Sequence, residues 1–334
     1  MNKNTSSPAY QAVQVSAPAR LHMGFIDLSG DLGRSFGSVG VAVESLQTSV
    51  TVSWAQTLEI SGQNECRLES LVDHFLKVLS VPRYFRIHMD SMIPPHAGLG
   101  SGTQLALAVG MALAKFWGLN LDVRDIARLS GRGARSGIGI AAFERGGFIV
   151  DGGRGPETVT PPLLSRLPVP AHWRWLMIFD KRCQGLSGTQ ELQAFQDLPS
   201  FPVEVAARLC HKLLISGLPA LAEANAQAFA RVIADIQVAN GEYFASAQGG
   251  RYTSRKVAKA LHWLENQGFV GLGQSSWGPT GFCLIPEADR AEEVLSQIQG
   301  EFCHYEDLVF QLVAARNTGA MIVCDEFETK RLIS

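Results

Sequence analysis

The strongest chemical signal in this sequence is a glycine-rich segment at residues 94–103, which reads PPHAGLGSGT. It runs directly into residues 104–117, an apolar stretch closed by Gly118 that predicts a buried helix. Glycines let a backbone approach a ligand closely, and the free N–H groups and dipole at a helix N-terminus favour negative charge. The segment therefore predicts a phosphate-binding loop, with Ser101 and Thr103 as additional hydroxyl donors.

An ordinary turn is the alternative for any glycine-rich loop, with Ser101 or Thr103 as the N-cap of the following helix. The segment lacks the lysine of a Walker loop. It is also not the dinucleotide fingerprint, which needs a preceding strand and a later acidic residue. The two prolines ahead of three glycines favour a binding loop over a plain turn.

The elements that must position this loop can be read from hydrophobic periodicity. Residues 38–53 and 85–89 alternate apolar and polar positions, as half-buried strands do. Residues 69–79 have helical spacing, and so do residues 123–131, where Asp122 and Asp125 form an N-terminal capping pair. The first half of the chain is therefore predicted to be mixed α/β.

A proline-rich stretch at residues 156–170 predicts a connection between domains, because prolines at that density interrupt regular structure. Beyond it we expect strands at 173–179 and 282–285, and helices at 203–215, 220–238 and 254–267. The sequence thus predicts two α/β domains, residues 1–170 and 171–334.

Composition excludes several classes of protein. The net charge of −2 creates no field that would attract nucleic acid or an anionic membrane. Hydrophobic residues make up 46% of the chain, which is typical of a compact globular protein. Six scattered cysteines without a CxxC pair favour reduced thiols, and no segment is apolar and long enough for a membrane span. We expect a cytoplasmic protein that binds neither nucleic acid nor membrane.

Three segments together resemble the GHMP kinase superfamily. Residues 94–103 fit P-x-x-x-G-L-G-S-G-T, close to the phosphate loop of that superfamily, which normally continues Gly-Leu-Gly-Ser-Ser-Ala. Residues 16–22, SAPARLH, stand where the superfamily has Ala-Pro-Gly-Arg, and residues 271–281, GLGQSSWGPTG, stand at its C-terminal glycine-rich loop. The resemblance covers nearly the whole chain. It implies a ribosomal-S5-like N-terminal domain that carries the phosphate loop and a ferredoxin-like C-terminal domain.

Departures from the kinase pattern point to one branch of the superfamily. Kinases often carry Ser-Gly-x-Asp, whereas Gly139 stands at the place of that aspartate, and Gly102 and Thr103 replace the Ser-Ala pair of the loop. The strings RLHMGFIDLSG, GRGARSGIGIAAFERGGFIVDGG and GQSSWGPTGF resemble the β-ribofuranosylaminobenzene 5′-phosphate synthase family. A missing base suits such an enzyme, since no hydroxyl nucleophile needs to be deprotonated.

That resemblance implies a decarboxylating phosphoribosyltransferase of tetrahydromethanopterin biosynthesis. It would join phosphoribosyl pyrophosphate (PRPP) to 4-aminobenzoate or 4-hydroxybenzoate as a C-riboside, with release of pyrophosphate and CO2. The choice between the two acids stays open at this point. Mg²⁺ is the expected cofactor, ATP is not expected, and a homodimer is the base-rate expectation.

The implied chemistry assigns roles to the motif residues, since the departing pyrophosphate needs cations and N–H donors. Arg20, Asp27 and Asp151 are predicted to be catalytic, and either aspartate could hold a metal ion or a ribose hydroxyl, with simple turn formation as the alternative for both. The predicted phosphate contacts are Pro95, Gly98, Leu99, Gly100, Ser101, Gly102, Thr103, Arg132, Arg135, Ser136, Gln274, Ser275 and Ser276.

The aryl acid needs a cation and an apolar slot. Lys181 and Arg182 follow the predicted strand 173–179 and are candidates for its carboxylate, and Trp277 is a candidate for stacking on its ring. A solvated turn and a core tryptophan are the respective alternatives. His22 and His96 lie beside the motifs and could move a proton, although a structural, hydrogen-bonded histidine is more common.

Other functions remain as alternatives. The first is an ATP-dependent small-molecule kinase of the same superfamily, because a fold does not fix a function. The second is a metabolite-binding protein without turnover, which the many charged candidates in three separate motifs argue against. Nucleic-acid binding is weaker still, since no basic stripe interleaves with aromatic residues.

Overall fold

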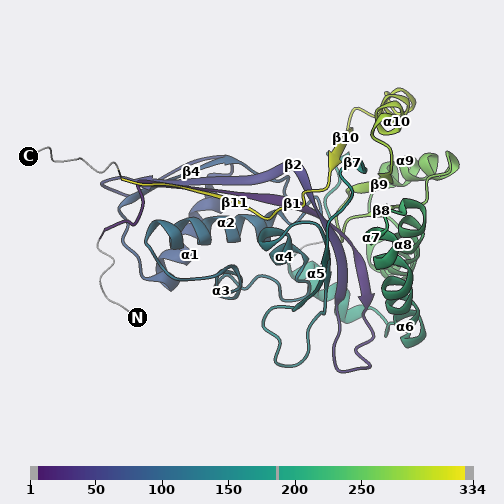
Figure 1. Ribbon diagram of the computed structural model, residues 1–334, viewed down its shortest axis with the longest axis horizontal. Helices are drawn as coiled ribbons and strands as arrows, with labels where there is room; N and C mark the ends of the chain where they lie inside the picture. The colour runs from purple at the N-terminus through teal and green to yellow at the C-terminus, as the bar shows by residue number, and fades with distance from the viewer. Residues whose placement is uncertain (1–6, 186–187, 328–334) are drawn as a thin grey trace, which may run out of the picture.

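Two sheets with helices packed against them make up the computed structural model, which describes residues 7–185 and 188–327 (Figure 1). The first sheet runs β11-β1-β2-β4-β3, and β5 and β6 join it through β2. Its strands are β1 (Ala12–Asp27), β2 (Gly37–Trp54), β3 (Glu59–Gly62), β4 (Phe85–Ser91), β5 (Phe148–Asp151), β6 (Leu163–Leu167) and β11 (Met321–Asp325).

Helices cover one face of this first sheet. They are α1 (Glu65–Leu79), α2 (Ser101–Phe116), α3 (Val123–Leu129) and α4 (Ile138–Glu144). Almost every residue of α2 is buried, and the helix packs against β1 and β2. The expected helices and strands of this half are confirmed, as is the capping box between Asp122 and Asp125.

The second sheet has the order β10-β7-β9-β8. Its strands are β7 (Arg174–Asp180), β8 (Leu272–Gln274), β9 (Gly281–Ile285) and β10 (Leu308–Ala314). The helices of this half are α5 (Thr189–Asp197), α6 (Val203–Lys212), α7 (Leu218–Ala222), α8 (Ala226–Gln248), α9 (Arg255–Asn266) and α10 (Ala288–Glu301), with a π-helical turn, η1 (Leu213–Gly217), between α6 and α7. The expected α/β architecture is confirmed.

The helix predicted at residues 220–238 is wrong in its bounds. The chain leaves the helical conformation at Ala224, which has a φ of 57°, and α8 begins only after Asn225. The Asn225 side chain accepts a hydrogen bond from the Ala228 N–H at 3.1 Å. An asparagine that caps a new helix therefore divides one apolar run into α7 and the much longer α8.

Strand β11 returns from the end of the chain to pair antiparallel with β1, which the sequence analysis did not anticipate. In Figure 1 this yellow strand lies along the purple β1, about 300 residues earlier in the chain. The boundary near residue 170 stays a prediction. The second sheet starts at Arg174, and the chain crosses back to the first sheet at its end.

One hydrophobic cluster joins the two halves. Leu21 and Val41 of the first sheet share it with Trp173, Trp175 and Phe229. Residues 203–222 are long and apolar enough to cross a membrane by length and composition. In the structure, however, this segment supplies core residues to the same cluster, namely Ala206, Leu209, Leu213, Ala220 and Leu221. Packing onto the sheet accounts for its apolar face.

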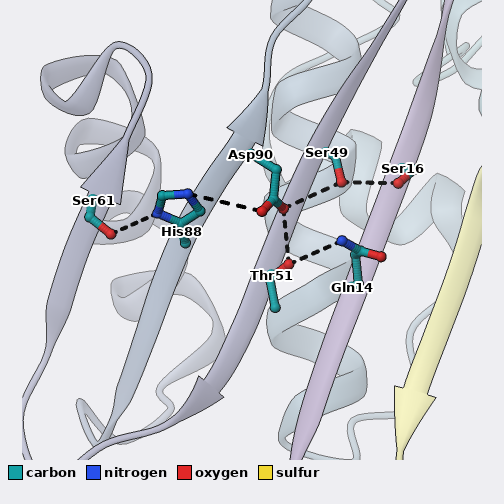
Figure 2. Close-up of polar contacts among 7 residues, drawn as sticks. All are labelled: Gln14, Ser16, Ser49, Thr51, Ser61, His88 and Asp90. Atoms are coloured by element: carbon teal, nitrogen blue, oxygen red, sulfur yellow. Dashed lines mark hydrogen bonds and ion pairs between the residues drawn. The ribbon is translucent and has the colours of Figure 1, made fainter.

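The other face of the first sheet carries a polar cluster that crosses four strands (Figure 2). His88 of β4 contacts Ser61 of β3 through Nδ1 at 2.9 Å and faces Asp90 through Nε2 at 4.0 Å. Asp90 in turn accepts hydrogen bonds from Thr51 and Ser49 of β2. These residues are cross-strand neighbours in the sheet register, and such pairs stabilise a sheet.

Candidate active site

The glycine-rich loop ends at the N-terminus of α2. Gly100 is the N-cap residue, with a φ of 80°, and no side chain caps the helix. The loop and the first turn of α2 line a cleft of about 610 Å³ through Gly98, Gly100, Ser101, Gly102 and Thr103. The backbone and the dipole of a buried 16-residue helix thus face this cleft.

A second glycine-rich loop, residues 271–281, packs on the first loop backbone to backbone. The Ser275 hydroxyl donates to the Gly98 carbonyl at 2.8 Å and accepts from the His22 N–H at 3.0 Å. A Cβ atom on Gly98 would stand 2.2 Å from the Ser275 carbonyl oxygen, and one on Gly278 would stand 2.3 Å from the Gly98 nitrogen. Glycine is therefore required where the two motifs meet.

Four arginines surround the first loop. Arg20 comes from β1, Arg67 from the first turn of α1, and Arg132 and Arg135 from the loop between α3 and α4; all four line the cleft. A Cβ atom on Gly102 would stand 2.9 Å from an Arg67 nitrogen and 3.4 Å from an Arg132 nitrogen. The guanidinium groups therefore lie directly over the glycines of the loop.

Burial destabilises the charged form of these arginines. It lowers the pKa of Arg20 to about 10, and it lowers the pKa values of Arg67 and Arg132, the latter also because Arg67 lies nearby. Arg20 donates a hydrogen bond to the Gly98 carbonyl, but its Nε and the Nε of Arg132 are buried without a partner among the described residues. Partly buried guanidinium groups with unpartnered Nε atoms, facing one cleft, are suited to bind an anion.

Glu191 of α5 is the only acidic side chain among the described residues that line the cleft. Its carboxylate lies 2.6 Å from Arg135, whose guanidinium also lies over the ring of Phe195. Burial raises the pKa of Glu191, while Arg135 and Arg20 act in the opposite direction. Glu191 and Arg67 were both missed by the sequence analysis, because neither belongs to a glycine-rich motif.

Asp151 and Asp27 do not line the cleft. Asp151 is completely buried, and its carboxylate accepts hydrogen bonds from the Ser38 and Ser136 hydroxyls and from the N–H groups of Gly137 and Gly153. Burial raises its pKa to about 6 in spite of these bonds. These contacts favour a positioning role for Asp151 toward the loop that carries Ser136 and Arg135, whereas its catalytic or metal-binding role stays a prediction.

Asp27 ends β1 in a local turn. Its side chain accepts hydrogen bonds from the Ser29 N–H at 2.8 Å and the Ser29 hydroxyl at 2.6 Å. This is the turn-forming alternative, because an aspartate readily bonds the backbone two residues on. The predicted catalytic role of Asp27 is therefore not what its position favours.

Lys181 and Arg182 are also absent from the lining of the cleft. Arg182 lies 2.7 Å from Asp307, its side chain is 77% exposed, and Lys181 donates its backbone N–H to the Asp307 carbonyl. These contacts make a solvated turn at the end of β7. The contacts favour the solvated-turn alternative, and the role of the two cations toward the aryl carboxylate stays a prediction.

Of the remaining predicted residues, some line the cleft and others lie outside its lining. Arg20, Arg132, Arg135, Ser136, Ser276 and Trp277 line the cleft, as do His22 and His96. Leu99 and Ser275 are buried and hold the loops in place, Pro95 is exposed outside the lining, and Gln274 accepts from the Thr253 N–H. The loops thus meet as predicted, although four of their residues serve structure rather than the cleft.

Gly139 lies close against the first turn of α2. A Cβ atom there would stand 3.1 Å from the Thr103 methyl group, and the Gly139 carbonyl accepts from the Gln104 side chain at 2.7 Å. The N-termini of α2 and α4 pack against each other at this point. A side chain at position 139 would therefore crowd Thr103 at the start of α2.

Comparison with known proteins agrees with this arrangement. Residues 67–147 match the model for the GHMP kinases N terminal domain, and residues 218–304 match that for GHMP kinases C terminal. A beta-ribofuranosylphenol 5'-phosphate synthase of Archaeoglobus fulgidus is 32% identical over 81% of this chain and 87% of that protein. Its counterpart in Methanothermobacter thermautotrophicus is 29% identical over 82% and 88%. Lactococcus lactis galactokinase shares the fold, with a TM-score of 0.68 at 14% identity over 94% and 95%.

Proposed function

Because the chain belongs to the beta-ribofuranosylphenol 5'-phosphate synthase family, we propose that it is a decarboxylating phosphoribosyltransferase. The substrates would be PRPP and 4-hydroxybenzoate, or its 4-amino analogue, and the products a C-riboside 5′-phosphate, pyrophosphate and CO2. The names of the relatives specify a phenol, which favours the hydroxy acid. Tetrahydromethanopterin biosynthesis, a cytoplasmic location and a homodimer remain parts of the proposal.

One observation carries this proposal: four arginines and an uncapped helix N-terminus surround a single cleft. PRPP carries two separate groups of phosphate oxygens, and arginine grips such oxygens in a planar, bidentate manner. A cleft of about 610 Å³ is also within the usual size range for small-molecule sites. The charge and the size of the cleft both suit this substrate.

The bond changes balance without a net proton transfer. The C–O bond to pyrophosphate breaks, and its electron pair leaves with pyrophosphate. The ring carbon that bears the carboxylate forms a bond to the anomeric carbon, and the electrons of its C–CO2 bond then restore the aromatic ring. CO2 thus leaves as a neutral molecule, and the negative charge ends on pyrophosphate. Since no base has to remove a proton, the reaction does not need an aspartate at position 139.

The residues of the cleft would act mainly by electrostatics and orientation. Arg20, Arg67 and Arg132, together with the α2 N-terminus, would stabilise the charge that grows on pyrophosphate. Among the described residues that line the cleft, Glu191 is the anionic group available to the positively charged ribose. Arg135 would orient Glu191 through their ion pair.

A Mg²⁺ ion held by the protein alone does not fit the described residues. They contain no group of three or more His, Cys, Asp or Glu side chains that could hold a metal ion. Mg²⁺ prefers phosphate oxygens and water and commonly arrives bound to its substrate. We therefore propose that Mg²⁺ enters as the complex of PRPP.

The test is release of labelled CO2 from carboxyl-labelled 4-hydroxybenzoate or 4-aminobenzoate in the presence of PRPP and Mg²⁺. We expect release that depends on PRPP and does not depend on ATP. Absence of release with either acid, from protein that is shown to be folded, would overturn the proposal. An ATP-dependent screen of small-molecule substrates would then test the kinase alternative.

A further inference from the structure

A small recess adjoins the cleft between β1 and α8. His22, Phe25, Ser276 and Trp277 line both cavities, so the two open against the same side chains. The recess itself has a volume of about 20 Å³. That is room for one water-sized group, since a buried water needs roughly 10–15 Å³ by this measure. The recess can therefore hold one substituent of an aromatic ring but not the ring.

The walls of the recess are partly aromatic and partly polar, with Gln237, Asn240, Gln248 and Gln274 beside the rings. Phe244 lies 4.3 Å from Trp277 between ring centroids, and Phe25 lies 4.7 Å from His22. Phe25, Phe244 and Trp277 form one buried cluster, which Phe195 also contacts. A planar apolar ring in the adjoining cleft would therefore meet aromatic surface at the mouth of the recess.

His22 is the unusual residue here. Its side chain is 2% exposed, and both of its ring nitrogens are buried without a hydrogen-bond partner among the described residues. Burial, reinforced by the charge of Arg20, lowers the pKa of His22 to about 3, so the ring is neutral at neutral pH. A neutral imidazole offers one donor and one acceptor, and neither has a partner on another described residue.

Trp277 adds a second unused group to the recess, its buried indole N–H. Trp117, Trp173 and Trp175 also bury an indole N–H without a partner, but none of the three lines the cleft or the recess. Arg251 is the one residue with a permanent charge among the described residues that line the recess. Among the residues that line the recess, His22 and Trp277 are thus the two with unpartnered buried polar side-chain atoms, whereas the amide side chains of Gln237, Asn240, Gln248 and Gln274 all have hydrogen-bond partners.

We propose that this recess binds the para-hydroxyl group of the aryl acid, and that His22 and Trp277 make the protein selective for that hydroxyl over an amino group. This inference rests on the proposed function and specifies its substrate. The hydroxyl donates to an imidazole nitrogen of His22 and accepts from the Trp277 N–H. An aromatic amine offers two N–H donors and only a delocalised lone pair, which leaves the Trp277 donor without a good acceptor.

Binding to the unmodified protein gives the first test. Calorimetric titration, with and without PRPP, would compare 4-hydroxybenzoate with 4-aminobenzoate, benzoate and 4-fluorobenzoate. We expect the hydroxy acid to bind at least about tenfold more tightly than each of the others, because only it satisfies both groups. Equal affinity across the series would overturn the proposal. Hydroxyl selectivity without CO2 release would instead overturn only the proposed reaction.

Variants give the second test. Trp277→Phe keeps the aromatic wall and removes the N–H, and Trp175→Phe is the matched control, because Trp175 is equally buried but lines neither cavity. We compare kcat/KM for 4-hydroxybenzoate with kcat/KM for 4-aminobenzoate. We expect Trp277→Phe to lower the ratio of the first to the second by about tenfold. His22→Leu should lower the same ratio, and Trp175→Phe should leave it unchanged. An unchanged ratio in both recess variants would contradict the assignment.

Discussion

Two polar clusters of this protein contain similar side chains, but the clusters differ in solvent exposure and in hydrogen bonding. On the outer face of the first sheet, His88 is about half exposed, and Ser61 and Asp90 lie at its two ring nitrogens (Figure 2). At the cleft, His22 is almost completely buried and neither ring nitrogen has a partner among the described residues.

The contrast separates a structural cluster from a binding site. A serine, a histidine and an aspartate in a row resemble catalytic machinery, but the outer cluster stands open to solvent and its hydrogen bonds follow the sheet register. In the cleft, charges are buried against one another and donors lack acceptors. In the second cluster the unpartnered groups include the charged side chains of Arg20 and Arg132 and gather around one cleft, as a ligand-binding site requires, so we assign function to that cluster.

Arg132→Gln should have the largest effect. It removes one of the buried cations, so we expect PRPP to bind about 30-fold to 1,000-fold more weakly, in line with ~2–4 kcal/mol for a charge-assisted contact. The unliganded protein should be no less stable, because the repulsion between Arg132 and Arg67 is relieved. Calorimetry and thermal unfolding measure the two effects. A large loss of stability with unchanged affinity would make Arg132 structural.

Ser275→Ala should have an intermediate effect. The hydroxyl holds the two glycine-rich loops together between Gly98 and the His22 N–H; the bond to the His22 N–H is buried and the bond to Gly98 is partly buried. We expect a loss of about 1–3 kcal/mol in the free energy of unfolding, with weaker PRPP binding because the first loop is less firmly held. Urea titration measures the change in the free energy of unfolding, and calorimetry measures the change in PRPP affinity. Thr280→Ala is a control of similar burial, because its hydroxyl has no partner among the described residues. Equal destabilisation in the two variants would contradict the account.

The pH dependence of stability should report on His22. Its folded pKa of about 3 lies below the ordinary value of 6.5, so the unfolded chain binds the additional proton between these values. Stability is therefore lost as pH falls below 6.5, by about 1.4 kcal/mol at pH 5.5 relative to pH 7.5. The burial-raised pKa of Asp151 acts in the opposite sense, since its stability contribution falls as pH rises toward about 6.

Comparison with His22→Phe isolates the first effect, because both proteins retain Asp151. We expect the wild-type protein to lose about 1.4 kcal/mol more than the variant between pH 7.5 and 5.5 in urea unfolding. His88→Phe, on the exposed cluster, is the control and should behave as the wild type does. Parallel pH profiles for wild type and His22→Phe would show that His22 is not buried as a neutral group.

Asp90→Asn should have the smallest effect. Asp90 is partly exposed, and its contacts with Thr51 and His88 are surface interactions worth about 0.5 kcal/mol or less. CO2 release and PRPP affinity should match those of the wild type. A loss of turnover beyond about twofold would mean that the outer face takes part in function, and would remove the distinction between the two clusters.

The sequence predicts those site residues that belong to local motifs or lie next to them. Glycines beside a helix start identify the loop, and Arg20, Arg132 and Arg135 lie within or next to recognisable segments. Arg67 could not be predicted, because an arginine in the first turn of an amphipathic helix resembles a solvated residue until α1 is placed beside α2. Glu191 lies on a short helix far from every motif, and only tertiary packing brings it to Arg135.

The site predictions that the structure does not favour have the same physical origin. Lys181 and Arg182 resemble a free cationic pair until Asp307, more than 120 residues later, neutralises that turn. Asp151 ends a strand, as many catalytic aspartates do, but the serines and backbone N–H groups that enclose it come from three segments. Strand β11 is short and pairs across almost the whole chain, so its role depends on topology and not on its own pattern.

The most direct test measures CO2 release from carboxyl-labelled 4-hydroxybenzoate, with PRPP and Mg²⁺, in wild-type, Asp90→Asn and Arg132→Gln proteins side by side. The account predicts equal release from the first two and a loss of at least about 30-fold from the third at limiting PRPP. Equal release from all three would contradict the claim that the buried arginines of the cleft form the site of phosphoribosyl transfer.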